Sequence, residues 1–156
     1  TIQYVVTERN KDKRTAFRNI FTNSAISEDC NFDKAERYML LLYQLYSIDL
    51  TLLCTFFHPE KVKEERGRKI TNPLMNEDGT FKTEYQQEYL IYEILNELWD
   101  FDISDIEESM TYLYENRLIS HKSKLLCTND DPLDIINDML TDKGYEFVSF
   151  ILHPQE

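Results

Sequence analysis

The chain has 156 residues and a formal net charge of −12, and 42% of its residues are hydrophobic and 13% aromatic. This apolar content excludes a disordered acidic chain, and the 3 glycines and 4 prolines are too few for a β-sandwich, a β-barrel or a glycine-rich phosphate loop. The composition therefore predicts a mainly α-helical protein. No stretch approaches the roughly 20 apolar residues of a membrane-spanning helix, so we expect no contact with a membrane.

The first half of the chain, residues 1–69, is predicted to be helical. Its first helix begins at a cap and has a basic face that includes Arg14 and Arg18. The second helix is apolar nearly all round, which predicts a central position covered on several sides. The third ends where Pro59 cannot continue the backbone hydrogen bonds. The predicted ranges are 7–22, 33–46 and 47–58, and the apolar face of the first consists of Ala16, Phe17, Ile20 and Phe21.

The second half is predicted to follow a break in the helical pattern. Residues 60–82 are rich in charged and turn-forming types, which predicts a long exposed excursion in which 70–82 is the loop between the halves. Two capping boxes, Thr83-x-x-Gln86 and Ser104-x-x-Glu107, then begin two more helices. Apolar segments on either side of a turn predict a small β-hairpin, and Thr141 begins the last helix. The two predicted strands are residues 119–127 and 133–140.

This order of elements predicts a winged-helix-like unit over residues 83–156, in one compact domain with the N-terminal half. Residues 115–119 match the end of a recognition helix, and Asp130-Asp131-Pro132 stands where the wing would turn. The segment Leu140-Thr141-Asp142-Lys143-Gly144-Tyr145-Glu146-Phe147 resembles the Leu-Thr-x-x-Gly-x-x-apolar motif of MarR-like and PadR-like regulators. The predicted fold class is therefore mainly α, a helical bundle with a C-terminal winged-helix-like unit that carries a small β-hairpin.

A wider resemblance covers most of the chain. Residues 13–20, residues 40–57 and the motif at Thr141 are similar to an uncharacterised bacterial and phage family of abortive-infection alpha-like type, found in prophages and defence islands. The resemblance implies a cytoplasmic protein of mobile-element context with no established enzymatic activity. It supplies no site residues.

Charge is distributed unevenly, and this distribution opposes DNA binding through the predicted recognition helix. Residues 1–69 hold 12 basic and 10 acidic side chains, whereas residues 70–156 hold 5 basic and 19 acidic ones. Binding to phosphates normally requires several Lys or Arg contacts, but the helix that would meet the bases contains Asp105, Glu107 and Glu108. The few basic residues of the predicted wing do not reverse this charge.

The sequence predicts no catalytic site, no metal site and no cofactor. His58, His121 and His153 are far apart in the sequence, and the aspartates of residues 129–138 lack the glycine and the final glutamate of a calcium loop. No Gly-x-Ser-x-Gly motif occurs. Cys54 lies in an apolar run, where a thiolate is poorly stabilised, so it is predicted to be a buried structural cysteine of a reduced intracellular protein.

These observations favour a non-catalytic protein-interaction module whose acidic surface binds a protein partner or another copy of itself. Aromatic residues flank the acidic helix and are typical interface anchors, namely Trp99, Phe101, Tyr112 and Tyr114. The candidate partner-binding residues are Asp105, Glu107, Glu108, Tyr112, Arg14 and Arg18.

Two alternatives stay open at this point. One is a transcriptional regulator that contacts DNA through the basic segments 9–18 or 61–69. The other is a small-molecule sensor with a pocket among Tyr43, Phe56, Phe57 and Trp99.

Overall fold

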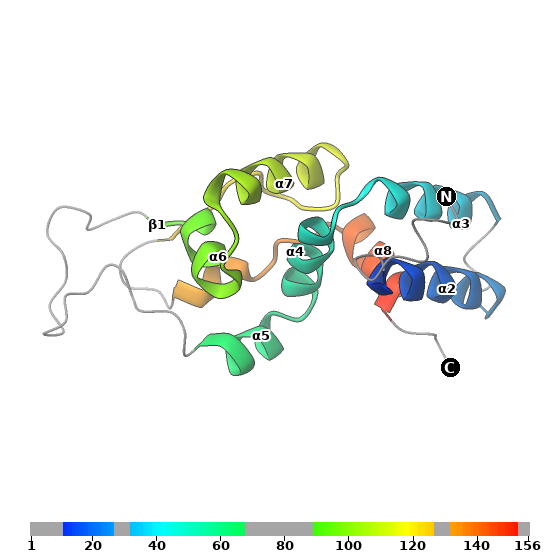
Figure 1. Cartoon of the computed structure of the whole chain (residues 1–156), viewed down its shortest axis with the longest axis horizontal. Helices are drawn as coiled ribbons and strands as arrows, with labels where there is room; N and C mark the ends of the chain where they lie inside the picture. The colour runs from blue at the N-terminus through cyan, green and yellow to red at the C-terminus, as the bar shows by residue number, and fades with distance from the viewer. Residues whose placement is uncertain (1–10, 27–31, 68–88, 127–131, 153–156) are drawn as a thin grey trace, which may run out of the picture.

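The computed structural model describes residues 11–26, 32–67, 89–126 and 132–152 (Figure 1). These residues are mainly helical, as the composition predicts. The described α-helices are α2 (Lys11–Ile26), α3 (Phe32–Gln44), α4 (Ser47–Phe57), α5 (Pro59–Arg66), α6 (Ile91–Trp99), α7 (Ile103–Glu115) and α8 (Asp142–Leu152). A 3₁₀ helix, η3 (Pro132–Ile136), and two short strands, β1 (Tyr89–Leu90) and β2 (Leu125–Leu126), complete the described elements.

Three helices, α2, α3 and α8, form one end of the molecule (Figure 1). Ile20 of α2 is fully buried there, and Tyr38 of α3 packs edge-on against Phe147 with 5.4 Å between the ring centroids. Phe150, one turn further along α8, lies 5.6 Å from the same ring. Aromatic rings therefore provide much of the contact between α3 and α8.

The central helix is α4, not the helix predicted at residues 33–46. Leu52 and Leu53 of α4 are fully buried, and α4 contacts both α7 and α8. In α3, by contrast, Leu40 is 59% exposed and Tyr43 is 49% exposed. The prediction was wrong because the apolar residues of α3 itself occupy more of its sides than the neighbouring helices cover.

Two buried asparagines join α2 to the end of α8. The Nδ2 group of Asn19 donates to the carbonyl oxygen of Ile151 at 2.8 Å, and that of Asn23 donates to Phe150 at 2.9 Å. The sequence predicted that Asn23 would end the first helix, but α2 continues to Ile26. The helix continues while the amide of this residue bonds to α8.

Helix α5 replaces the first part of the predicted excursion. Pro59 is favourable in the first turn, where the missing N–H would have no helical partner. Val62 is buried, and Arg66 donates from Nη1 to the carbonyl oxygen of Leu98 at 2.9 Å. The guanidinium carbon of Arg66 also lies 3.9 Å from the ring centre of Trp99. The predicted loop at 70–82 lies outside the described residues.

The winged-helix prediction is wrong. The segment predicted as the second wing strand forms η3 instead, and a single bridge between Ile119 and Leu140 is the pairing described between the two predicted strands. β2 pairs with β1, which precedes α6, so that Leu126 lies opposite Tyr89. The physical reason is burial, since Ile135 and Ile136 are consecutive and both buried, whereas a strand would turn one of them outward. The predicted wing turn at 130–131 lies outside the described residues.

Local contacts at the start of α8 explain the motif at Thr141 without a wing. Thr141 caps α8, because its Oγ1 accepts a hydrogen bond from the backbone N–H of Gly144 at 3.0 Å. Its own N–H donates to the carbonyl oxygen of Leu118 at 3.1 Å. A Cβ atom at Gly144 would lie 2.0 Å from that same oxygen, so the helix approaches the backbone more closely than a side chain permits.

Helix starts and corners differ in detail from the prediction. α7 begins at Ile103 with Asp102 as its N-cap, two residues before the predicted cap at Ser104. The cap predicted at Thr83 lies outside the described residues. Three corners use non-glycine residues in the left-handed region, at φ values of 56°, 61° and 56°, namely Asp100, Arg117 and Asp138.

Among the described residues, no single helix is long and apolar enough to cross a membrane. Asp33–Gln44 and Ser47–Phe57 meet the length and composition requirement only together, as a pair bent by 120°.

We expect Asn19→Ala and Asn23→Ala each to lower the free energy of unfolding by about 1–2 kcal/mol, because each leaves a buried carbonyl without its hydrogen bond. Urea unfolding followed by far-UV circular dichroism measures the change. Thr22→Ala is the matched control, since its hydroxyl bonds to the backbone of its own helix in an exposed position. Equal stability of all three variants would contradict this role for the asparagines.

Gly144→Ala is expected to destabilise the protein by about 1–3 kcal/mol, since α8 must move away from Leu118 to admit the methyl group. Ser149→Ala on the same helix serves as the control, because its hydroxyl bonds only within α8. The readout is the shift in thermal midpoint. A stabilising effect of Gly144→Ala, as expected from helix propensity alone, would refute the close approach.

Candidate protein-binding groove

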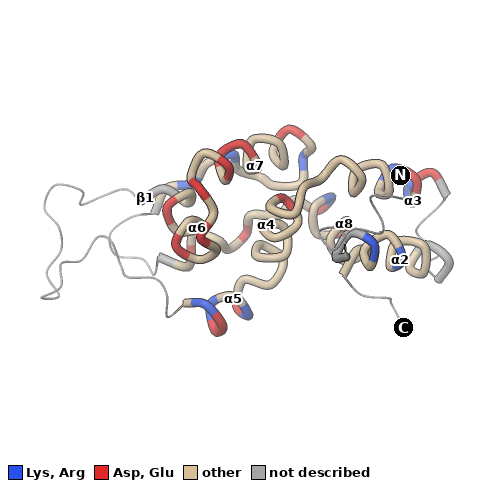
Figure 2. Tube along the Cα trace, viewed as in Figure 1, with Lys and Arg blue, Asp and Glu red and all other residues tan. Residues whose placement is uncertain are grey.

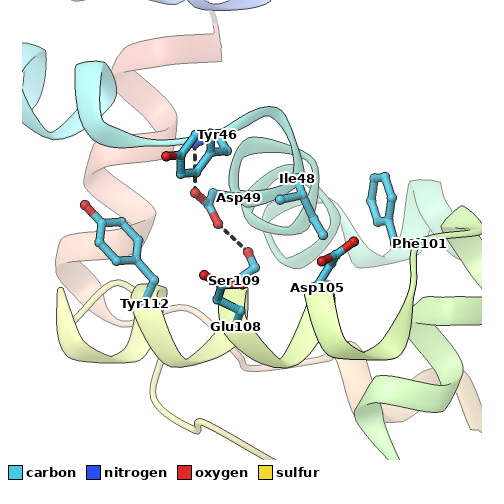
Figure 3. A pocket seen from close by; sticks show the side chains of 8 residues that line it. All are labelled: Tyr46, Ile48, Asp49, Phe101, Asp105, Glu108, Ser109 and Tyr112. Atoms are coloured by element: carbon cyan, nitrogen blue, oxygen red, sulfur yellow. Dashed lines mark hydrogen bonds between the residues drawn. The ribbon is translucent and has the colours of Figure 1, made fainter.

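One hollow of the described surface lies between α7 and the corner that joins α3 to α4 (Figure 3). Its volume is about 460 Å³. We call it the α7 groove, and its lining combines carboxylates, aromatic rings and one aliphatic side chain. The lining residues are Tyr46, Ile48, Asp49, Phe101, Asp105, Glu108, Ser109 and Tyr112.

Helical spacing aligns one wall of the α7 groove. Asp105, Glu108 and Tyr112 stand at positions i, i+3 and i+7 of α7, so they share one side of the helix over about 10.5 Å. The opposite wall comes from the start of α4, with Ile48 and Asp49. Tyr46, between α3 and α4, lies with Tyr112 at one end of the groove (Figure 3). It is 75% exposed, so its ring is open to contact.

A buried carboxylate joins the two walls. Asp49 is only 2% exposed, and its Oδ2 accepts a hydrogen bond from the backbone N–H of Tyr46 at 2.8 Å. Its Oδ1 accepts the hydroxyl proton of Ser109, which is itself buried in α7. Because Asp49 belongs to the first turn of α4 and its carboxylate bonds to Ser109 of α7, it fixes the distance between the walls. At the end of the groove where Tyr46 lies, Tyr112 donates its hydroxyl proton to the Oε1 atom of Gln44 at 3.2 Å.

A second hollow of about 420 Å³ continues the acidic surface around α7. It shares Glu108 and Tyr112 with the α7 groove. Asp105, Glu107 and Glu108 are all exposed, and Figure 2 shows acidic positions along the length of α7. The complete lining of the second hollow is Ser104, Glu107, Glu108, Thr111, Tyr112 and Glu115.

Two of these carboxylates also affect the stability of their surroundings. Burial, and then the negative charge of Glu107, raise the pKa of Tyr92 above its ordinary value. The neutral phenol of Tyr92 donates a hydrogen bond to the carbonyl oxygen of Lys122 at 2.8 Å. Asp105 lies in the first turn of α7, where a negative charge interacts favourably with the helix dipole. Structural reasons alone therefore account for part of the acidity.

The candidate residues divide into two groups. Asp105, Glu107, Glu108 and Tyr112 lie together on the α7 surface, whereas Arg14 and Arg18 lie on α2 at the other end of the molecule (Figure 2). Sequence reasoning did not find the opposite wall. The available signal was the break at Tyr46 followed by an acidic residue at the third position of a helix, which is typical of a cap but says nothing about α7.

The other aromatic residues named from the sequence have different surroundings. Trp99 is half-buried beneath the guanidinium of Arg66, and Tyr114 is 46% exposed on α7. The pocket predicted among Tyr43, Phe56, Phe57 and Trp99 matches neither of the two hollows described above. Phe56 is buried in the core, and Phe57 packs against Tyr145 with 4.8 Å between ring centroids. Cys54, predicted to be buried, is half-buried.

Within the described ranges, no three His, Cys, Asp or Glu side chains lie close enough together to hold a metal ion. Comparisons of the chain with protein-family models, with curated proteins and with solved structures give no significant match. The resemblance to the abortive-infection family therefore stays a prediction. The α7 groove must be interpreted from its own chemistry.

We expect Asp49→Ala to lower the free energy of unfolding by about 2–4 kcal/mol, because it leaves the Tyr46 N–H and the Ser109 hydroxyl without their partner. Asp105→Ala, a control carboxylate in the same groove, is exposed and should cost less than about 1 kcal/mol. Urea unfolding measures both. If the two variants are equally stable, Asp49 does not hold the groove walls together.

Proposed function

We propose that this protein is a non-catalytic interaction module, and that its α7 groove receives a positively charged segment of a protein partner. The observation that carries the proposal is the mixture of groups in one hollow. Exposed carboxylates of Asp105 and Glu108 stand beside the ring of Tyr112 and the aliphatic side chain of Ile48.

This mixture matches the chemistry of Lys and Arg side chains. A lysine or arginine has an apolar stem that packs on rings and a charged end that binds carboxylates. Tyr112 and the strongly exposed Tyr46 are of the residue type most favoured as interface anchors. Complementary charge would increase the association rate and favour basic partners over acidic ones.

The same charges argue against nucleic acid as the ligand of this groove. All charged residues of α7 are acidic, namely Asp105, Glu107, Glu108 and Glu115, and each carboxylate near a phosphate weakens binding. The DNA-binding alternative names the basic segments 9–18 and 61–69. In the second segment, Lys63 pairs with Glu60 and Asp134. Arg66 bonds to Leu98 and lies over Trp99. These two basic side chains already have partners within the protein, so this segment offers fewer basic side chains to phosphates than its sequence suggests.

The hydrogen bonds of the buried groups also favour a binding role over a catalytic one. The Ser109 hydroxyl donates to Asp49, whose second oxygen accepts a backbone N–H. Both residues are buried. These bonds connect the walls of the groove, which is a structural use of a serine and a carboxylate.

A labelled synthetic helical peptide of alternating lysine and leucine blocks tests the proposal by fluorescence anisotropy. We expect binding that weakens as salt rises, since screening shortens the range of charge attraction to about 3 Å at 1 M salt. The double variant Asp105→Asn with Glu108→Gln should weaken binding by about tenfold or more, which corresponds to about 1.4 kcal/mol.

The matched control removes the same charge elsewhere. Glu64→Gln with Glu65→Gln changes two exposed residues of α5, outside both hollows. It should bind the peptide almost as the unchanged protein does. If both double variants lose the same affinity, the peptide responds to net charge alone and the groove has no special role.

A further inference from the structure

The outward face of α2 carries two arginines and an exposed phenylalanine in one line. Arg14, Arg18 and Phe21 stand at positions i, i+4 and i+7, opposite the buried face of Ala16, Asn19, Ile20 and Asn23. Phe21 is 66% exposed, although the sequence predicted it on the apolar face. We call Arg14, Arg18 and Phe21 the α2 face. It is the kind of basic and apolar surface that the α7 groove is proposed to receive.

The spacing of the two surfaces agrees. Seven residues of helix separate Arg14 from Phe21, and seven separate Asp105 from Tyr112, which is about 10.5 Å in each case. With the helices side by side and parallel, Arg14 would approach Asp105 and Arg18 would approach Glu108. Phe21 would then reach the end of the groove where Tyr46 and Tyr112 lie (Figure 3).

The two surfaces of one molecule do not meet. α2 packs against α3 and α8 at one end of the molecule, and α7 lies toward the other end (Figure 2). A contact between the α2 face and the α7 groove must therefore join two molecules. The opposite charges of these two surfaces attract each other at close range and orient two copies against the general repulsion from the net charge of −12.

We infer that the occupant of the α7 groove is the α2 face of a second copy of this chain, so that molecules associate head to tail. This inference rests on the proposed function and names the partner. Arg14 and Arg18 would pair with the carboxylates of Asp105 and Glu108, and the exposed ring of Phe21 would be covered by tyrosines. A contact between two different surfaces leaves one surface of each kind free after two copies have joined. Further molecules therefore add in a row, or the assembly closes as a ring.

Analytical ultracentrifugation of the full chain tests this inference. The average mass should rise with protein concentration from the micromolar to the submillimolar range, and it should fall back toward the monomer at 1 M salt, where screening reaches about 3 Å. Phe21→Ala keeps all charges and removes only an exposed ring, so it should fold normally and weaken association by about tenfold.

Two charge-removing variants then separate the two surfaces. Arg14→Gln with Arg18→Gln leaves an intact α7 groove, and Asp105→Asn with Glu108→Gln leaves an intact α2 face. Each should stay monomeric alone. An equimolar mixture should form a one-to-one pair and stop there, because only one native contact is possible between the two variants.

Matched controls remove the same charges from other exposed positions. Lys61→Gln with Lys122→Gln controls for the arginines, and Glu64→Gln with Glu65→Gln controls for the carboxylates. Both should associate as the unchanged chain does. Association by either surface variant alone, or a mixture that stays monomeric, would overturn the inference.

The outcome also separates the inference from the proposed function. If the unchanged chain stays monomeric at all concentrations while the lysine–leucine peptide still binds the α7 groove, the second-copy inference is wrong and the interaction function stands. If the peptide also fails to bind, both are wrong.

Discussion

Helix ends inside a protein need hydrogen-bond partners, because the first N–H groups and the last carbonyls of a helix have none within it. In this protein, side chains supply several of these partners. Asn19 and Asn23 of α2 bond carbonyls in the last turn of α8, and Arg66 of α5 bonds Leu98 near the end of α6. Asp49 acts at the start of its own helix, since it lies in the first turn of α4 and accepts from the N–H of Tyr46, just before that helix. The helices are short and share one apolar core, and these bonds give the contacts between helix ends a defined geometry.

The α7 groove depends on one of these contacts. Asp49 of α4 accepts a hydrogen bond from the backbone N–H of Tyr46, just before that helix, and another from Ser109 of α7, which is 60 residues further along the chain. Because the carboxylate of Asp49 is buried and hydrogen-bonded, the α4 wall has a fixed position beside the exposed carboxylates of α7. Such preorganisation reduces the ordering that binding would otherwise require.

The sequence predicted the helices well where the signals were local. The break before Ser47, the proline after Phe57 and the cap at Thr141 depend on neighbours in the chain, and the structure confirms the helices that they delimit. The predicted wing failed because a short apolar segment such as 133–140 does not distinguish a strand from a 3₁₀ turn until its burial is known.

The candidate site was predicted only in part, for the same physical reason. Clustered carboxylates on one helix could be expected to lie on its surface, and Asp105, Glu107 and Glu108 do so. The opposite wall depends on how α4 crosses α7, which follows from tertiary packing. The sequence predicted Arg14 and Arg18 on a basic face. It did not predict that Phe21 lies beside them outside the core, because this depends on where α8 packs against α2.

The left-handed corners at Asp100, Arg117 and Asp138 have a consequence for the unfolded chain. Glycine would adopt these angles without strain, yet the whole chain contains only three glycines. Aspartate and arginine restrict the backbone more than glycine does, so the unfolded ensemble has fewer conformations to lose on folding. These corners therefore carry a small conformational strain in the native state, and the same residues reduce the entropy of the denatured state.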